Sequence, residues 1–191
     1  MTPKMNVPES FPIRLWISFL QPYDSQSGVC TAVRMIAADC AMSVPISTPS
    51  GVLLSPHGDQ DLSIADSPFA TGAGVHLLDG PWELLREQAE GFRKRGIRTR
   101  RLPTGLEPFN PYYRRLTPYY FFSPERFSTA EAAAYALAIL GRPDQGLLLA
   151  SKLGFRSAYL LNSRVLAQIP IDQQLRDQPS VKSKSARRYC A

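Results

Sequence analysis

Hydrophobic residues along this chain gather in short apolar runs, which alternate with longer segments of helical periodicity. Apolar runs of about four to eight residues between turn residues are typical of buried strands. Such runs predict strands at residues 13–20, 51–54, 74–79 and 97–102. Helical spacing and cap residues predict helices at residues 31–42, 81–94, 128–140, 147–152 and 157–169. Because strands and helices alternate, we expect an α/β fold with a parallel or mostly parallel sheet.

The strand predicted at residues 74–79 is the stretch around which the rest of the chain is organised. It ends at the carboxylate of Asp79, after which the chain turns at Gly80 and Pro81, and Trp82 begins the next element. In an open α/β sheet, ligands bind in the crevice beyond the carboxyl ends of the strands. An Asp before a helix is also a common N-terminal cap. Position alone therefore leaves both a chemical role and a capping role open for Asp79.

Local signals also define the remaining segments. Ser128 and Glu131 form a capping box, and Phe127 is placed to pack on Ala132 as a hydrophobic staple. Residues rich in Gly, Asp, Ser and Pro between 57 and 73 predict a segment that is mostly loop. Three further segments are expected to lack regular structure: a flexible leader at 1–12, a functional or partly disordered loop at 103–126, and a basic flexible tail at 171–191.

Length and composition suit one domain, or one domain with a small subdomain. The chain has 191 residues, 44% of them hydrophobic, and no apolar run approaches the roughly 20 residues that span a bilayer. We recognise no signal peptide at the N-terminus. Three cysteines without a CxxC pair are typical of a protein in the reducing cytoplasm. Because two histidines and these cysteines make a poor ligand set, we expect no bound metal. The lack of a long apolar run leads us to expect no membrane partner.

The formal net charge of +6 is concentrated in clusters rather than spread along the chain. Clustered positive charge indicates a polyanionic partner, most simply a nucleic acid. The candidate RNA-binding residues are Arg93, Lys94, Arg95, Arg98, Arg100 and Arg101. Aromatic residues among the arginines between 112 and 122 favour RNA, because unpaired bases stack on rings beside cationic grooves. A solvated helix face with a charged tail explains the same charges without RNA.

Several segments, in order, resemble one family: the S-adenosylmethionine-dependent aminocarboxypropyltransferases that modify small-subunit ribosomal RNA in archaea and eukaryotes. The resemblance covers about residues 13–168 and is clearest from Gly51 to Trp82. The matching segments are Trp16–Phe19 with Cys30-Thr31, Gly51–Pro56, Ser63–Asp66, Asp79–Trp82, Leu102-Pro103, Asn110-Pro111, Phe127–Ala132, Lys152–Gly154 and Asn162. Two segments depart from the family pattern: residues 25–29 replace a basic loop, and the segment between Asn110 and Phe127 is longer than in the family.

The resemblance implies a fold, a reaction and a set of site residues. The fold would be a SPOUT-like knotted domain at residues 51–170 with a mostly parallel sheet, preceded by a smaller N-terminal region at 13–50. S-adenosyl-L-methionine would be the donor of a 3-amino-3-carboxypropyl group, and Asp79 would be the catalytic residue. The donor would contact Thr31, Leu77, Trp82, Leu102, Ser128 and Thr129.

The acceptor implied by the resemblance is a uridine or pseudouridine of small-subunit rRNA. The partner would be this rRNA or the pre-ribosomal small subunit, and the protein would act as a cytoplasmic monomer. Three alternatives stay open: transfer of the same group to a tRNA uridine, methyl transfer, and a non-catalytic RNA-binding factor in ribosome assembly.

Overall fold

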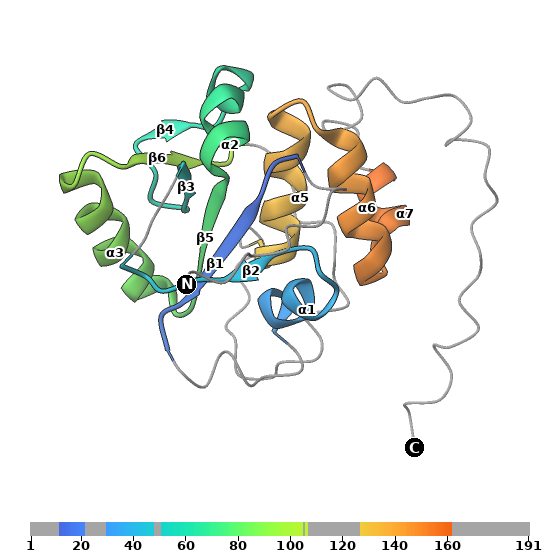
Figure 1. Ribbon diagram of the computed structural model, residues 1–191, viewed down its shortest axis with the longest axis horizontal. Helices are drawn as coiled ribbons and strands as arrows, with labels where there is room; N and C mark the ends of the chain where they lie inside the picture. Colours follow the sequence, from blue (N-terminus) through green and yellow to red (C-terminus); the bar gives the residue numbers. More distant parts are fainter. Residues whose placement is uncertain (1–11, 22–29, 48–50, 105, 107–126, 162–191) are drawn as a thin grey trace, which may run out of the picture.

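A computed structural model of the chain describes residues 12–21, 30–47, 51–104, 106 and 127–161 (Figure 1). Its centre is a single six-stranded sheet with the order β2-β1-β5-β3-β6-β4. Every paired strand runs parallel to its neighbour, so the expected α/β fold with a parallel sheet is confirmed. The strands are β1 (Leu15–Phe19), β2 (Met42–Ser43), β3 (Val52–Leu54), β4 (Gln60–Asp61), β5 (Val75–Asp79) and β6 (Arg98–Arg101).

Helices cover both faces of this sheet. They are α1 (Thr31–Ala37), the 3-10 helix η2 (Ile64–Asp66), α2 (Ser67–Ala73), α3 (Trp82–Lys94), α5 (Thr129–Ile139), α6 (Pro143–Leu153) and α7 (Arg156–Leu161). Figure 1 shows α3 on one side of the sheet, with α1, α5 and α6 on the other. None of the helices within the described residues is long and apolar enough to cross a membrane.

The two faces of the central strand pack into different apolar clusters. Val75 and Leu77 lie in the larger cluster, which the alanine-rich helix α5 shares. Leu78 lies in a smaller cluster with Leu85 and Phe92 of α3. Side chains alternate between the faces of a strand, so β5 is buried on both sides. This double burial explains why its sequence is apolar up to the final carboxylate.

The segment before residue 50 belongs to the same sheet as the segment after it. β1 pairs with β5 along its whole length, from Leu15 opposite Val75 to Phe19 opposite Asp79. The Gln145 side chain of α6 also bonds the main chain of Ile13, accepting from its N–H and donating to its carbonyl. Strands from both sides of residue 50 therefore form one sheet, and a separate N-terminal region at 13–50 stays a prediction.

The structure confirms all four expected strands, as β1, β3, β5 and β6, and corrects several boundaries. The first helix ends at Ala37 rather than near residue 42, because Asp39 adopts a left-handed φ of 54° and β2 follows. Residues 57–73 are not mostly loop, since they contain β4, η2 and α2. The helix predicted at 147–152 begins earlier, at Pro143. The leader, the tail, nearly all of the loop at 103–126 and the end of the helix predicted at 157–169 lie outside the described residues.

Candidate functional site

Two strand ends and two helix starts meet at one edge of the sheet. The last residues of β1 and β5 are paired there, with Phe19 opposite Asp79. Thr129, the first residue of α5, lies at the same edge, since its hydroxyl bonds Asp79. Thr31, the first residue of α1, lies there too, since it bonds the start of α5. The edge is the carboxyl end of a parallel sheet, which is where ligands bind in this class of fold.

Asp79 is the half-buried centre of this corner. Its Oδ2 accepts a hydrogen bond from Cys30 Sγ at 3.1 Å. Its Oδ1 accepts a second one from the hydroxyl of Thr129. An ionised carboxylate has about four acceptor sites. Donors among the described residues occupy two of them, which leaves two within this part of the chain for a ligand or a reacting proton.

The capping alternative for Asp79 is wrong in this structure. The N-cap of α3 is Pro81, whose carbonyl accepts from the amides of Leu84 and Leu85, and α3 has no side-chain cap. The carboxylate of Asp79 contacts the starts of α1 and α5 instead, which are 49 and 50 residues away along the chain.

The starts of α1 and α5 are tied to each other as well as to Asp79. Thr31 Oγ1 accepts a hydrogen bond from the amide of Ala130 at 3.3 Å. Ser128 and Glu131 form the expected capping box, with the Ser128 amide donating to Glu131 Oε2 at 2.8 Å. The hydroxyls of Thr31 and Ser128 are therefore already engaged within the chain, which gives these two residues a structural role beside any contact with a ligand.

Cys30 belongs to this corner and was not among the residues predicted to form the site. Burial and the nearby negative charge of Asp79 raise the pKa of Cys30 to about 12. The thiol is therefore neutral at neutral pH and can act as a donor to the carboxylate. Its place in a Cys-Thr pair directly before a helix was visible in the sequence, but nothing in that pattern indicated its partner.

The other residues expected to contact the donor lie in different environments. The Leu77 side chain is 2% exposed inside the larger cluster, and Leu102, directly after β6, is partly buried against the same cluster. Trp82 is the first residue of α3, and its side chain lies outside the described part of the chain. The structure thus gathers Asp79, Thr31, Ser128 and Thr129, while Leu77 contributes to the core beside them.

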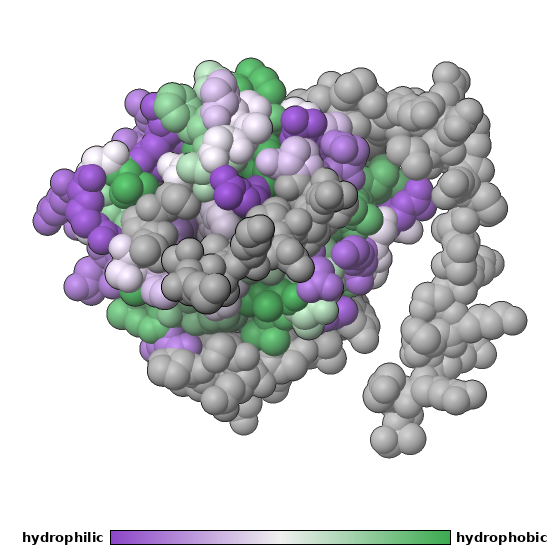
Figure 2. Space-filling view, in the orientation of Figure 1, coloured by the Kyte–Doolittle hydropathy of each residue, from purple (hydrophilic) through white to green (hydrophobic). Residues whose placement is uncertain are grey.

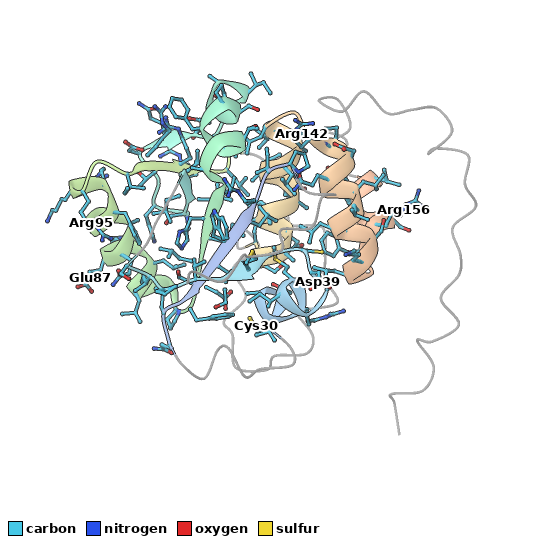
Figure 3. All side chains as sticks on the ribbon, in the orientation of Figure 1. Cys30, Asp39, Glu87, Arg95, Arg142 and Arg156 are labelled. Atoms are coloured by element: carbon cyan, nitrogen blue, oxygen red, sulfur yellow. The ribbon has the colours of Figure 1, made fainter. Side chains whose placement is uncertain are left out.

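The six candidate RNA-binding residues divide into two groups. Arg93, Lys94 and Arg95 are exposed at the end of α3, and Figure 3 labels Arg95 far from Cys30. The other three make ion pairs: Arg98 and Arg100 with Asp66, and Arg101 with Asp61.

Arg100 departs from the expectation of an RNA contact. It is only 8% exposed, and its Nε lies 3.0 Å from both carboxylate oxygens of Asp66, which is itself 2% exposed. A buried guanidinium paired in this way joins β6 to η2 and is not available to a phosphate at the surface.

Comparison with known proteins gives one family match and several relatives. Residues 52–185 match the family model described as "Ribosome biogenesis protein, C-terminal". Over 159 residues the chain is 29% identical to the 16S rRNA aminocarboxypropyltransferase of Methanosarcina mazei, covering 82% of this chain and 84% of the relative. It is 30% identical over 139 residues to the enzyme of that name from Halobacterium salinarum, covering 72% of this chain and 75% of the relative.

A solved structure is similar in fold. It is described as the SAM-dependent rRNA:acp-transferase Tsr3 from Vulcanisaeta distributa. The alignment has a TM-score of 0.66 and 26% sequence identity, and it covers 81% of each chain. The α/β fold with a parallel sheet thus matches that of a solved structure.

Proposed function

Because this chain belongs to the ribosome biogenesis protein family defined by the matched C-terminal region, we propose that it is an S-adenosylmethionine-dependent rRNA aminocarboxypropyltransferase. It transfers a 3-amino-3-carboxypropyl group to a uridine or pseudouridine of small-subunit rRNA. The observation that carries this proposal is the Asp79 corner, where a carboxylate with free acceptor sites stands at the carboxyl edge of the sheet. The proposal is supported by the two relatives named above, each of which is named a 16S rRNA aminocarboxypropyltransferase.

The chemistry is an in-line displacement at carbon. A ring nitrogen of the base bonds to the methylene carbon of the donor, the carbon–sulfur bond breaks with its electron pair going to sulfur, and the nitrogen loses its proton. Such a reaction depends strongly on the placement of the two reactants.

Asp79 suits the acid–base part of this reaction. Its side chain is half-buried, held by Thr129 and Cys30, and keeps two acceptor sites that can receive the proton of the ring nitrogen. A carboxylate at this place also attracts the positive charge that the donor carries on sulfur. We assign Asp79 the role of general base, with Thr129 and Cys30 as positioning residues.

The residues around Asp79 fit a donor with an adenosine end and an amino acid end. The resemblance assigns Leu77 of β5 and Leu102, directly after β6, to the adenine. Leu102 is partly buried and would contact the ring, while Leu77 lies in the core beside it. Thr31 and the start of α5, with Ser128 and Thr129, would hold the amino acid end. Trp82 would pack on the adenosine or attract the sulfonium.

Four further properties, predicted from the resemblance or from composition, remain part of this proposal. The domain is knotted in the SPOUT-like manner, the protein is a monomer, it acts in the cytoplasm, and it needs no metal. Its partner is the rRNA or the pre-ribosomal small subunit, and the candidate surface is the exposed cluster of Arg93, Lys94 and Arg95.

The experiment that tests the function is calorimetric titration with S-adenosylmethionine and with methylthioadenosine, followed by a transfer assay on small-subunit rRNA. We expect both compounds to bind, and methylthioadenosine to be released while the RNA gains the mass of the aminocarboxypropyl group. Release of S-adenosylhomocysteine would instead show methyl transfer. Absence of binding by both compounds would favour the assembly factor.

Variants separate the role of Asp79 from the stability of the fold. Asp79→Asn keeps an acceptor for Thr129 but removes the base, so turnover should fall by about 10²-fold or more while the donor still binds. Asp39→Asn is a matched control, because Asp39 is exposed and Asn tolerates its left-handed backbone. Equal turnover in both variants would contradict the assigned base.

A further inference from the structure

The exposed basic cluster and the catalytic corner lie at opposite ends of the sheet. Asp79 ends β5, three residues before α3 begins, and α3 then runs for 13 residues to the cluster of Arg93, Lys94 and Arg95. At about 1.5 Å per residue, this helix carries its last turn about 18 Å from its start. Figure 3 likewise shows Arg95 and Cys30 toward different ends of the molecule.

The start of β6 lies at that same distant end. Arg98 is opposite Val52 in the sheet, and Val52 is opposite Val75, the first residue of β5. Asp79 lies four residue steps along the strand from Val75, which corresponds to about 13 Å. Arg98 follows Arg95 by three residues, so their Cα atoms are at most about 11 Å apart.

Arg98 carries an aromatic partner at the surface. Its guanidinium carbon lies 3.7 Å from the centre of the Phe69 ring. Phe69, on α2, is 46% exposed and is one of two exposed large hydrophobic side chains in the described residues, with Ile64. An aromatic ring stacked with a guanidinium, open to solvent, is the kind of platform on which unpaired bases stack.

Charge is not balanced over this surface. Asp66 serves both Arg98 and Arg100, Asp59 lies 3.6 Å from Arg100, and Asp61 pairs with Arg101. No ion pair involves Arg93, Lys94 or Arg95 among the described residues. The cationic excess is therefore concentrated at the end of α3, where Figure 2 shows hydrophilic side chains gathered at the left of the view.

From these observations we propose that Phe69, Arg93, Lys94, Arg95 and Arg98 form a second RNA-docking surface, which holds a segment of the RNA remote from the nucleotide being modified. The inference rests on the proposed function for its partner and adds where and how that partner is held. Lysine and arginine at the end of α3 contact phosphates, while the Phe69–Arg98 stack receives an unpaired base. Because of these two contacts, a long RNA binds more tightly and has a lower KM than a short fragment that occupies only the catalytic corner.

The first experiment compares full-length small-subunit rRNA with nested fragments that carry the modified nucleotide. The variant Arg93→Gln/Lys94→Gln leaves Arg95 on the Phe92 ring, where its guanidinium carbon lies 4.5 Å from the ring centre. It should lower the slope of log affinity against log salt by roughly 1.5 for the long RNA, since each lost phosphate contact removes roughly 0.7 to 0.9. The ratio of KM for the short fragment to KM for the long RNA should fall toward one.

The control variant is Arg142→Gln/Arg156→Gln, which makes the same charge change at the N-cap of α6 and at the start of α7, away from the end of α3 (Figure 3). It should keep the salt slope and the KM ratio of the parent. If both double variants lower the slope equally, the effect is one of net charge and the docking surface is overturned. The same outcome follows if neither variant changes the slope.

The second experiment tests the aromatic contact. Phe69→Ala should weaken binding of the long RNA roughly fivefold or more. Arg98→Lys keeps the charge but removes the planar partner, so it should weaken the same contact without changing the salt slope. If both variants bind the long RNA with unchanged affinity, no base stacks on Phe69 and Arg98, and that part of the proposal is overturned.

A cross-link locates the docked segment directly. Phe69→p-benzoylphenylalanine should cross-link to rRNA at a nucleotide other than the one that gains the aminocarboxypropyl group. A cross-link at the modified nucleotide itself would overturn the remote position. Titration of S-adenosylmethionine and release of methylthioadenosine are measured on the same preparations. Donor binding and transfer without RNA effects or a cross-link would refute the docking surface alone, whereas loss of donor binding in the parent protein would refute the function.

Discussion

The Cys30 thiol donates a hydrogen bond to the Asp79 carboxylate over 3.1 Å, which joins the residue before α1 to the last residue of β5. The bond requires a protonated thiol. Burial, followed by the charge of Asp79, raises the pKa of Cys30 to about 12 and so keeps it protonated. The reactivity of the Cys30 thiol therefore depends on the charge of the Asp79 carboxylate beside it.

The first prediction concerns the reactivity of this thiol. Because only the thiolate is alkylated, a pKa near 12 predicts that Cys30 reacts with iodoacetamide at pH 8 about 10³-fold more slowly than free cysteine. Asp79→Asn removes the negative charge and should speed the reaction. Peptide mass spectrometry of the time course gives the rate at Cys30, with the urea-unfolded chain as reference. A folded-state rate equal to the unfolded rate would contradict the contact.

The second prediction concerns Thr129, whose hydroxyl donates to the other oxygen of Asp79. Thr129→Val keeps the shape of the side chain but removes the donor, so the carboxylate is held by Cys30 alone. We expect kcat to fall more than the affinity for S-adenosylmethionine, and Thr129→Ser to restore most of the loss. Steady-state kinetics with the rRNA substrate measure this split. A Thr129→Ser variant as impaired as Thr129→Val would mean that the methyl group, rather than the hydroxyl, matters.

The third prediction separates Arg100 from Arg101, neighbours in β6 that the sequence does not distinguish. Arg100 pairs with the buried Asp66, whereas the Arg101–Asp61 pair is 43% and 46% exposed on its two side chains. Arg100→Gln should lower the free energy of unfolding by about 3 kcal/mol, because the buried Asp66 carboxylate loses its closer and better buried charged partner and keeps only the half-exposed Arg98 at 3.5 Å. Arg101→Gln should lower it by less than about 1 kcal/mol. Urea unfolding measures both, and equal effects would show that burial does not govern the pair.

Signals that are local in the sequence predicted their elements well. The capping box at Ser128 and Glu131 formed as expected, because its hydrogen bonds join residues only three apart. The strand before Asp79 was recognisable because it is buried on both faces and therefore apolar throughout. β2 and β4 were missed, since strands of two residues have no periodicity to detect. The staple partner of Phe127 remains a prediction for Ala132, while its ring packs edge-on against Tyr135 at 5.5 Å.

Contacts between distant segments could not be read from the sequence. The strand end left both a chemical and a capping role open for Asp79, and only the family resemblance favoured the first. Neither indicated that Cys30 and Thr129 contact it from 49 and 50 residues away. The burial of Arg100 was also hidden, because its run of basic neighbours looks the same whether a side chain faces Asp66 or solvent. The partners of Asp79 and the burial of Arg100 depend on contacts between distant segments, and no local sequence pattern predicts such contacts.

The last prediction concerns His76, which is fully buried in the middle of β5 beside the Phe92 ring. Ser18 Oγ donates to the carbonyl of Val44 at 2.7 Å, so it accepts from His76 Nε2 at 2.9 Å. His76 Nδ1 then carries no proton, and it has no hydrogen-bond partner within the described residues. Burial lowers the pKa of His76 from 6.5 to about 4, because a charged ring would lose its hydration.

This shift makes the stability of the fold depend on pH in a defined window. Between pH 6.5 and about 4, the unfolded chain binds a proton at this residue and the native chain does not. The contribution is therefore fully present above pH 6.5 and is lost as the pH falls toward 4, by on the order of 3 kcal/mol. The free energy of urea unfolding, measured from pH 7 to pH 4.5, should fall less steeply in His76→Gln than in the parent. Parallel curves for the parent and His76→Gln would mean that the ring is protonated as readily in the fold as in the unfolded chain.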